Sequence, residues 1–449
     1  MKILIVGAGQ VGLHLGKILI AESHDLTIVD IDPDACKKAN DLLDALVIEG
    51  SGSSQQILQK AGIETSDMVI AVSAVDEVNV MVCLVASKVG VGTKIARLRN
   101  TEYSHAGALL EKEDLGIDFI IHPEEETARE LVWLIKRSAA TDVVEFAGGK
   151  IQLVGVRIDR NSPIVNQTLQ QITEAHPDIL FRVVAIFRNN QKTIIPTGRD
   201  VVNIGDQLFF ITQTERVQQV LDLAGKSDEK LDSLMILGGG KVGRLVAAEM
   251  ERDKHIDIKL IESSRDKSEK IAQAVRRTLI IMGDGTDIDL LATEGIMDMD
   301  GYVAVTDDEE TNIISCLLAK HLGVKRTLAL VNRSDYMPVM SSIGLDAAVD
   351  KQMITANAIL RFIRRGNIVS FAALRGIDAE VFEIDVNKGT KIAGKTLKQL
   401  KLPRDMIIGL VIRNGQVFVP IGESSIQPGD KLIIFTLPTM VKTVEKLFN

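Results

Sequence analysis

The sequence predicts an α/β protein with two tandem doubly wound parallel sheets, each followed by a small α+β domain. Three observations lead to this prediction. The chain repeats itself, short apolar runs alternate with helical patterns, and a glycine-rich turn stands at the same place in each repeat. A chain of 449 residues has room for roughly two to four domains.

The repeat is clearest in its larger part. Ile3–Gly12 reads ILIVGAGQVG, and Met235–Gly243 reads MILGGGKVG. Gly50–Ser53 returns as Gly283–Thr286, 233 residues later. The same spacing relates three single residues to their counterparts: Asn79 to Asn312, Cys83 to Cys316 and Tyr103 to Tyr336. Such a constant spacing indicates that a whole structural unit is duplicated.

A smaller part of the chain repeats as well. Ile204–Leu208 matches Pro428–Leu432, and Thr168–Gln171 matches Thr396–Gln399. The order along the chain is therefore large, small, large, small. The charged stretch Gly225–Ser233 is typical of a linker between the two halves. We expect four domains, with the boundaries 1–136, 141–225, 231–363 and 366–449.

The first large unit alternates predicted strands and helices. Apolar runs predict strands at Lys2–Val6, Leu26–Val29, Leu46–Ile48, Met68–Val72, Lys94–Leu98 and Phe119–Ile121. Helical patterns lie between them, at Val11–Ala21, Pro33–Asn40, Ser54–Ala61 and Val78–Val89. This order is typical of a parallel sheet that is covered by helices on both faces.

The first small domain is richer in strands. We expect them at Gln152–Ile158, Arg182–Arg188, Thr193–Pro196 and Gln207–Ile211. Asn189-Asn190 and, in the second small domain, Asn414-Gly415 stand where hairpins would turn. A short strand-rich module of this kind is typical of a small α+β domain.

Composition excludes several classes of function. The net charge is −9 and aromatic residues make up 4% of the chain, with one Trp, so neither a basic face nor a stacking surface for nucleic acid is expected. Three widely spaced cysteines predict no disulfide framework and no zinc site, and favour a reducing compartment. No uncharged apolar run of about 18 residues predicts a membrane span. The apolar start Met1–Leu15 contains Gly7-Ala8-Gly9 and is better explained as a buried strand entering a turn than as a signal peptide.

Two glycine motifs predict nucleotide sites. Each fits G-x-G-x-x-G between a predicted strand and a predicted helix, the arrangement of a Rossmann-type unit. The first glycine permits a tight turn, the second lets a pyrophosphate approach, and the third lets helix and strand pack closely, while the helix N-terminus attracts the phosphate charge. The motif residues are Gly7, Ala8, Gly9, Gln10, Val11 and Gly12, and then Gly238, Gly239, Gly240, Lys241, Val242 and Gly243.

An acidic residue closes the second strand of each unit: Asp30 in the first and Glu262 in the second. Such a carboxylate can accept hydrogen bonds from both ribose hydroxyls and would repel a 2′-phosphate, which favours NAD(H) over NADP(H). ATP and ADP carry the same ribose, so the motif does not separate them from NAD(H).

Further site residues are expected where parallel strands end. Ser73 with Ala74, and Thr306 in the second unit, follow the fourth strands. Arg97, Leu98 and Arg99 end the fifth strand, where the arginines either meet phosphate or face solvent. Leu330 and Asn332 replace these arginines in the second unit. After the third strands stand Ser51 in the first unit and Asp284 in the second, so the two sites should differ.

The sequence carries few candidate catalytic or metal-binding groups. The seven histidines show no metal-ligand spacing, and neither a G-x-S-x-G elbow nor a P-loop is present. His122-Pro123-Glu124 is the best catalytic candidate, but a strand-to-helix connection with Pro at the start of the helix is the favoured interpretation. Cys83 and Cys316 are expected to be core residues. We predict neither catalytic residues nor a metal site.

Together these motifs resemble the Trk-type potassium-uptake regulatory subunits, which carry tandem "regulator of potassium conductance" units. The resemblance covers essentially the whole chain. It implies a peripheral protein on the cytoplasmic face of the membrane, bound to a potassium-conducting membrane subunit. It also implies binding of NAD(H), with ATP or ADP as alternatives, and assembly into a homotetramer with eight units. Ser51 and the absence of the arginine pair from the second unit depart from the pattern.

Two other functions stay open at this stage. An NAD-dependent oxidoreductase would need an acid or base beside the nicotinamide, yet the first small domain has no tyrosine and only His176 as a histidine. A nucleotide-responsive regulator of another transporter or of an enzyme would share every motif found here.

Overall fold

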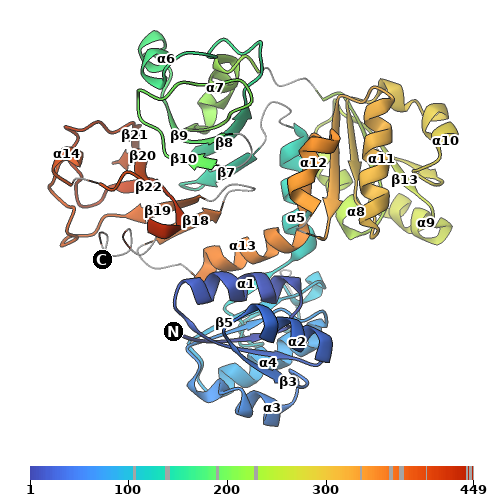
Figure 1. The fold of residues 1–449 in the computed structure, drawn as a ribbon. Helices are drawn as coiled ribbons and strands as arrows, with labels where there is room; N and C mark the ends of the chain where they lie inside the picture. Colours follow the sequence, from blue (N-terminus) through green and yellow to red (C-terminus); the bar gives the residue numbers. More distant parts are fainter. Residues whose placement is uncertain are drawn as a thin grey trace.

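The computed structural model describes residues 1–104, 108–136, 142–188, 192–226, 231–333, 336–363, 368–373, 379–400, 402–440, 443 and 447. These residues form two six-stranded and two five-stranded sheets. Along the chain each six-stranded sheet is followed by a five-stranded one, so that four modules can be distinguished (Figure 1). The predicted fold class is confirmed.

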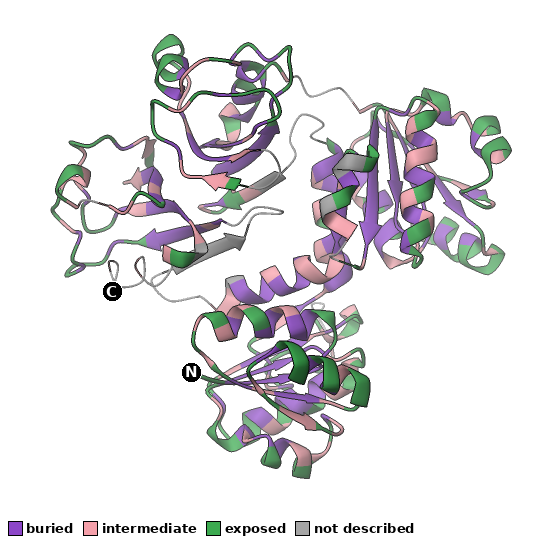
Figure 2. Cartoon of the chain, viewed as in Figure 1, coloured by how far each residue is buried: buried purple, intermediate pink, exposed green. Residues whose placement is uncertain are grey.

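The first large unit is built on a parallel sheet with the strand order β3-β2-β1-β4-β5-β6. Strands β2 and β3 are added on one side of β1, and β4 to β6 on the other. The boundary between β1 and β4 is the topological switch point, where ligands bind in such folds. Its central strands are apolar at nearly every position because helices cover both faces (Figure 2). The strands are β1 (Lys2–Val6), β2 (Asp25–Asp30), β3 (Leu46–Glu49), β4 (Met68–Ala71), β5 (Thr93–Arg97) and β6 (Phe119–Ile121).

The second large unit repeats this topology, with the order β14-β13-β12-β15-β16-β17. All of its strand pairs are parallel. Its switch point therefore lies between β12 and β15. The strands are β12 (Ser233–Leu237), β13 (Asp257–Glu262), β14 (Leu279–Met282), β15 (Gly301–Ala304), β16 (Arg326–Val331) and β17 (Ala347–Asp350).

The predicted helices of the first unit are present within two residues of their expected ends. Side-chain oxygens cap several helices by accepting backbone N–H bonds, as Asp32 does for α2 and Ser264 for α9. The helices of the first unit are α1 (Gln10–Ala21), α2 (Pro33–Leu42), α3 (Gln55–Lys60) and α4 (Asp76–Lys88). Those of the second unit are α8 (Lys241–Met250), α9 (Arg265–Ala274), α10 (Ile288–Thr293), α11 (Glu309–His321) and α12 (Met337–Ile343).

The last helix of each large unit packs on the other unit, which the sequence analysis did not predict. Helix α5 (Pro123–Lys136) lies against α8, helix α13 (Lys351–Ile363) lies against α1, and α5 and α13 contact each other (Figure 1). Leu131 and Leu134 share a core with α8, and Ile359 and Leu360 share one with α1. Each sheet therefore completes one helical layer with a helix from the other half of the chain.

The small domains are built on antiparallel sheets. Their orders are β10-β9-β11-β8-β7 and β18-β19-β22-β20-β21. The first contains β7 (Asp142–Phe146), β8 (Ile151–Arg157), β9 (Phe181–Arg188), β10 (Lys192–Ile194) and β11 (Gln207–Gln213), with helices α6 (Leu169–Ala175) and α7 (Val217–Leu223). The second contains β18 (Ile368–Ala373), β19 (Glu380–Asp385), β20 (Met406–Arg413), β21 (Gln416–Phe418) and β22 (Lys431–Thr436), with α14 (Leu397–Leu400).

The sequence analysis predicted four of the five strands of the first small domain and missed β7 and both helices. The hairpin at Asn414-Gly415 is confirmed, since both residues have positive φ and join β20 to β21. Asn189-Asn190 lies outside the described residues. The repeated Thr168–Gln171 is the capping box of α6: the Thr168 side chain accepts from the Gln171 N–H, and the Gln171 side chain accepts from the Thr168 N–H.

A second repeated motif also has a structural reason. Asp206 is 1% exposed and accepts two hydrogen bonds from Arg188, at 2.9 and 2.7 Å. Asp430 accepts two from Arg413, both at 2.7 Å. A buried carboxylate needs such a bidentate partner, so the repeated Gly-Asp motifs stabilise the small domains.

The two small domains pack against each other through apolar faces of their sheets. One core contains Phe209 and Ile211 from the first domain together with Ile433 and Phe435 from the second. Arg182 crosses this interface and donates to the carbonyls of Ile408 and Pro420, at 3.0 and 2.7 Å. In the described part of the chain, no helix combines the length and hydrophobicity needed to span a membrane.

Candidate functional site: two glycine-lined crevices

The first glycine turn has the geometry that the motif predicts. Gly7 has a φ of +116°, and a Cβ there would lie 2.8 Å from the Ser73 backbone nitrogen. A Cβ on Gly12 would lie 1.9 Å from the Gly7 carbonyl oxygen, so only glycine lets α1 approach β1 this closely. A Cβ on Gly9 meets no atom within 4 Å. The space in front of Gly9 at the N-terminus of α1 is the expected place for a phosphate.

The second turn reproduces the first. Gly238 has a φ of +105°, and a Cβ on Gly243 would lie 1.9 Å from the Gly238 carbonyl oxygen. Gly240 again has open space around it. Gly239, which corresponds to Ala8, has a tighter position, because a Cβ there would lie 2.1 Å from Ile271 Cδ1. The first turn thus combines two close approaches with one open position, and the second combines three close approaches with one open position.

The two acidic residues hold the turns in place. Asp30 accepts from the Ala8 N–H at 2.5 Å and from the Asp32 N–H at 2.9 Å. Glu262 accepts from the Gly239 and Ser264 N–H groups, both at 2.9 Å. A carboxylate has about four acceptor sites, so each side chain keeps capacity for ribose hydroxyls.

A buried asparagine ties the crevice of each unit together, and the sequence analysis did not assign it a role. Asn79 accepts from the Ser73 N–H at 2.9 Å and donates to the carbonyls of Ser73 and Arg97, at 3.1 and 2.7 Å. Asn312 makes the same three contacts, with Thr306 and Leu330. The constant spacing of this pair along the chain was the only signal for it. Each asparagine links the segment after the fourth strand to the end of the fifth strand.

The second crevice encloses a cavity of about 290 Å³. Five of the predicted residues line it: Gly238, Gly240, Glu262, Asp284 and Thr306. Asp284 Oδ1 accepts from the N–H and the hydroxyl of Thr286, at 2.9 and 2.8 Å, and these bonds lower the Asp284 pKa. In the first unit Ser51 takes this position and bonds Ser53 instead, at 2.8 Å between hydroxyls.

The predicted arginines lie where the two large units meet. Arg99 Nε is 3.2 Å from Glu124 Oε1, and Lys351 of the second unit binds the same oxygen at 2.7 Å. Burial lowers the pKa of Arg97, which is half-buried. The Lys241 ammonium donates a hydrogen bond to the Arg99 carbonyl. Its side chain therefore points away from the second crevice, although its backbone belongs to the turn. We call Arg99, Glu124, Lys241 and Lys351 the inter-unit cluster.

Glu124 is the buried centre of this cluster. It is 2% exposed. Burial opposes its ionisation, but the hydrogen bond and charge of Lys351, together with the charge of Arg99, outweigh burial and hold the Glu124 pKa below its usual value. Arg99 is therefore engaged with a carboxylate between the units, a position the sequence analysis did not consider.

The catalytic candidate His122 has a structural role. Its Nδ1 is 2.8 Å from the Leu98 carbonyl oxygen, and its Nε2 is 2.6 Å from Ser104 Oγ. A carbonyl oxygen only accepts, so Nδ1 carries a hydrogen and donates to Leu98. Helix α5 begins at Pro123, as the favoured interpretation predicted. Cys83 and Cys316 are fully buried, and burial raises the Cys83 pKa to about 12.

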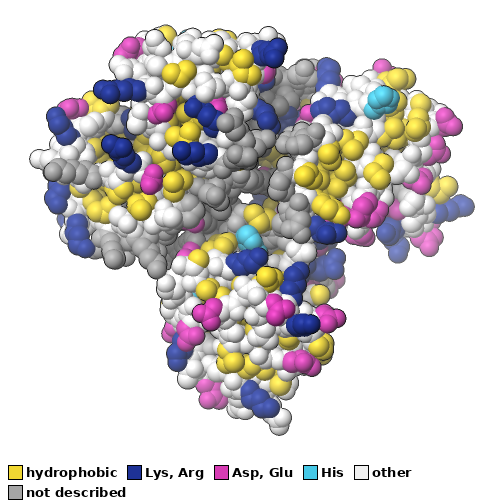
Figure 3. Space-filling view, viewed as in Figure 1, with side chains coloured by type: hydrophobic (Ala, Val, Ile, Leu, Met, Phe, Trp, Pro, Cys, Tyr) yellow, Lys and Arg dark blue, Asp and Glu magenta, His cyan; other side chains and the backbone are white. Residues whose placement is uncertain are grey.

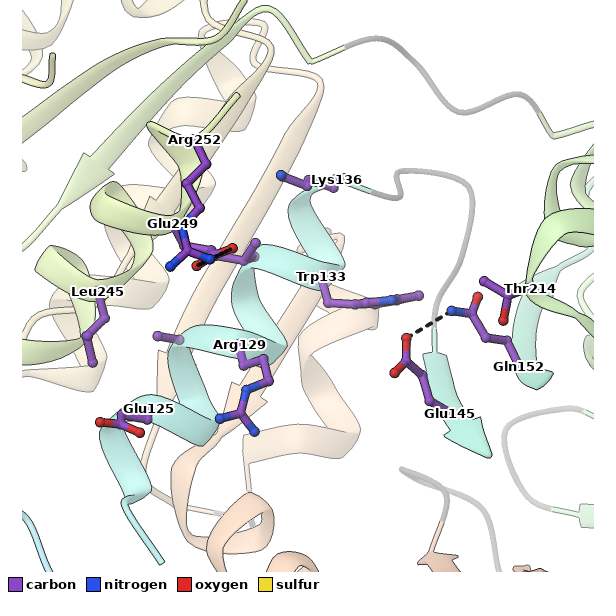
Figure 4. A pocket seen from close by; sticks show the side chains of 12 residues that line it. Glu125, Arg129, Trp133, Lys136, Glu145, Gln152, Thr214, Leu245, Glu249 and Arg252 are labelled. Atoms are coloured by element: carbon purple, nitrogen blue, oxygen red, sulfur yellow. Dashed lines mark hydrogen bonds and ion pairs between the residues drawn. The ribbon is translucent and has the colours of Figure 1, made fainter. Parts of the chain in front are cut away.

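A larger cavity, of about 680 Å³, lies between α5, α8 and strands β7 and β8 (Figure 4). Its charged groups include side chains that bind one another: Gln152 donates to Glu145 at 3.0 Å, and Arg252 lies 2.8 Å from Glu249. It contains neither a glycine turn nor the end of a parallel strand. The features expected of a nucleotide site therefore lie in the crevices, although this cavity is larger. Among the described residues, no group of three or more His, Cys, Asp or Glu side chains is arranged to hold a metal ion.

Comparison with protein families matches both halves of the chain. The TrkA-N domain matches residues 3–123 and 234–351, which contain the two crevices. The TrkA-C domain matches residues 153–225 and 381–449, in the two small domains.

Relatives and solved structures match over the whole chain. The chain is 35% identical to the Trk system potassium uptake protein TrkA of Azorhizobium caulinodans, covering all of this chain and 99% of that protein. It is 34% identical to TrkA homolog 2 of Methanosarcina mazei, over the whole of both chains. The GsuK channel bound to NAD has the same fold, with a TM-score of 0.62 and 18% identity, over all of this chain and 78% of that one. The chain thus belongs to the TrkA family of Trk system potassium uptake proteins.

Proposed function

We propose that this chain is the cytoplasmic regulatory subunit of a Trk-type potassium uptake system. In this proposal it binds nucleotides and gates a membrane subunit that conducts potassium, and it catalyses no reaction. The observation that carries the proposal is the pair of glycine-lined crevices. They lie in two large units that exchange helices, since α5 and α13 each pack on the other unit. The names of the TrkA relatives support the potassium uptake system.

The proposed ligand is NAD or NADH, with ATP and ADP as alternatives. The open positions at Gly9 and Gly240, each at a helix N-terminus, suit a pyrophosphate. Asp30 and Glu262 suit a ribose. Two structures of GsuK, one bound to NAD and one bound to ADP, support both kinds of ligand.

Regulation needs two arrangements of the units that bind the ligand with different affinity. A tenfold preference supplies about 1.4 kcal/mol per site, and several sites in one assembly add their effects. The exchanged helices offer a physical route for this coupling, because α5 leaves the first sheet and packs on the second. A ligand that shifts the first crevice would then also shift α5, which packs on the second unit.

We further propose a homotetramer, which would place eight large units in one ring. Helices α4 and α11 each carry apolar side chains on an outer face: Met81 and Leu84 are 41% and 37% exposed, and Ile314 is 58% exposed. Apolar side chains also gather on the surface of the second large unit near α11 and α12 (Figure 3). Contact between copies would remove these side chains from water.

An NAD-dependent oxidoreductase is the alternative. In the described part of the first small domain the one histidine, His176, is exposed on the surface. His122, the catalytic candidate, is held by two structural hydrogen bonds. Neither observation favours hydride transfer. Oxidation of NADH by the purified chain in the presence of carbonyl substrates would support the alternative.

The test is a flux assay with the full chain and its Trk-type membrane subunit in liposomes. Potassium flux should depend on the chain and should change when NAD⁺, NADH, ATP or ADP is added. The variant with both Asp30→Ala and Glu262→Ala should still bind the membrane subunit but lose the nucleotide response. Flux that ignores both the chain and the nucleotides would refute the proposal.

A further inference from the structure

The two crevices differ in charge. Glu262, Asp284, Asp307 and Asp308 line the second cavity, where Lys267 is the one Lys or Arg among the described lining residues. The register of the sheets gives the corresponding positions in the first unit, since Ala304 pairs with Leu237 as Ala71 pairs with Val6. Counting from these strand ends, Ala74 and Val75 stand where the second unit has Asp307 and Asp308.

The two added carboxylates lie on one side of the switch point. In a doubly wound sheet a dinucleotide crosses this point, with its adenosine on the side of the second strand and its other half on the side of the fourth. Glu262 ends β13, on the adenosine side, whereas Asp307 and Asp308 follow β15, on the opposite side. The second half of a bound dinucleotide would therefore meet two negative charges.

Local hydrogen bonds fix one of these charges. The Asp308 carboxylate caps α11 by accepting from the Thr311 N–H at 3.1 Å, and it also binds the Thr311 hydroxyl. These bonds lower the Asp308 pKa, which keeps the side chain ionised at neutral pH. Asp307 is exposed beside it and lines the same cavity.

We propose that the second crevice selects NAD⁺ over NADH, because Asp307 and Asp308 attract the cationic nicotinamide ring and gain nothing from the neutral ring of NADH. This inference rests on the proposed function, in which the crevice binds a nucleotide. The first crevice, with Ala74 and Val75, has no such preference. The chain therefore reads the redox state of the NAD pool through its second half.

The size of the effect follows from exposure. Opposite unit charges about 4 Å apart in water interact enough to change affinity about fivefold, and partial burial increases this. We expect NAD⁺ to bind the second crevice about fivefold to tenfold more tightly than NADH. The ratio should shrink as salt is added, because both carboxylates are accessible to solvent.

The experiment uses calorimetric titration of the full chain with one crevice closed. Gly9 has open space and a φ of −67°, which any residue can adopt. Gly9→Asp therefore places a carboxylate in the phosphate position, where it can also cap α1. Gly240→Asp closes the second crevice in the same way. NAD⁺ should be preferred in the Gly9→Asp chain, and the Gly240→Asp chain should bind both forms equally.

Two substitutions in the Gly9→Asp chain test the assigned residues. Asp307→Ala introduces the residue of the first unit, and Asp308→Ser removes the charge but keeps a capping oxygen. Together they should bring the NAD⁺ to NADH affinity ratio close to one. Binding of ADP-ribose, which lacks the nicotinamide ring, should change far less than binding of NAD⁺. Melting curves of each variant confirm that the fold is intact.

The outcomes separate the inference from the proposed function. Equal binding of NAD⁺ and NADH by the Gly9→Asp chain overturns the inference and leaves the nucleotide site standing. A preference that survives both substitutions overturns the assignment to Asp307 and Asp308. Failure of the folded Gly9→Asp chain to bind any adenine nucleotide overturns the second site altogether, and with it the inference.

Discussion

The inter-unit cluster gives the sharpest test of how the two halves are joined. Lys351 lies 2.7 Å from Glu124, a carboxylate that is 2% exposed. Lys351→Met keeps the length and apolar stem of the side chain but removes the charge. Of its two ion-pair partners Glu124 then keeps Arg99, at 3.2 Å, and the side chain of Arg99 is 57% exposed. Breaking a buried pair in this way costs about 3–5 kcal/mol, and we expect the lower end because Arg99 remains.

Thermal melting of the full chain measures this loss. At roughly 2–4 °C per kcal/mol for units of this size, a loss of about 3 kcal/mol lowers the melting temperature by roughly 6–12 °C. The double variant Lys351→Met with Glu124→Gln should recover most of it, because the buried carboxylate charge is then removed as well. Arg252→Met breaks the exposed pair with Glu249 and serves as the matched control, with an expected loss below about 1 kcal/mol.

The effect should depend on pH with a definite sign. The folded-state pKa of Glu124 lies below its ordinary value of 4.5, so its contribution is fully present above pH 4.5 and is lost as pH falls through the folded-state pKa. In Lys351→Met, the lysine no longer offsets the effect of burial on the Glu124 carboxylate. Protonation of Glu124 then removes the buried charge, so the melting temperature of the variant should approach that of the wild type on acidification. Two results would contradict the assigned role of the cluster: a Lys351→Met variant that melts like the wild type at neutral pH, or a lowered melting temperature that Glu124→Gln does not restore.

Four further predictions follow from the crevices and the outer helices. Gly12→Ala should destabilise the chain by about 1–3 kcal/mol, because its Cβ would lie 1.9 Å from a carbonyl oxygen, whereas Gly9→Ala should be nearly neutral in the same melting experiment. Asp30→Ala and Glu262→Ala should each weaken NADH and ATP binding at their own crevice by about 1.5–3 kcal/mol in calorimetric titrations; unchanged binding in the double variant would contradict the assignment. Added salt should weaken ATP binding more at the first crevice than at the second, because acids already repel phosphate at the second. Gly240→Asp leaves the first crevice open and Gly9→Asp leaves the second, and an equal dependence of ATP affinity on salt in these two chains would disprove this. Light scattering should show a tetramer for the unaltered chain, as proposed, and a smaller mass for Met81→Glu combined with Ile314→Glu; an equal mass for both would contradict the proposed role of these side chains.

Features that depend on neighbouring residues could be predicted from the sequence. A strand, a glycine turn and a helix form one continuous segment, so G-x-G-x-x-G located both crevices. The second strand pairs directly with the first, which is why Asp30 and Glu262 could be placed beside the turns from their spacing alone. The duplicated pattern gave the tandem architecture, because a constant spacing survives wherever the same fold is formed twice.

Only the tertiary structure decided what happens between the halves. Apolar periodicity predicts that a helix buries one face, but it does not say which surface covers that face. Helices α5 and α13 each pack on the opposite unit, and no local pattern distinguishes this from packing on their own sheet. The same limit explains the polar residues: Arg99 and Lys241 have the charge expected of phosphate ligands, yet Arg99 binds Glu124 and Lys241 binds a carbonyl of the other unit. A side chain's partner depends on distances through space, and those are fixed only when the two halves of the chain come together.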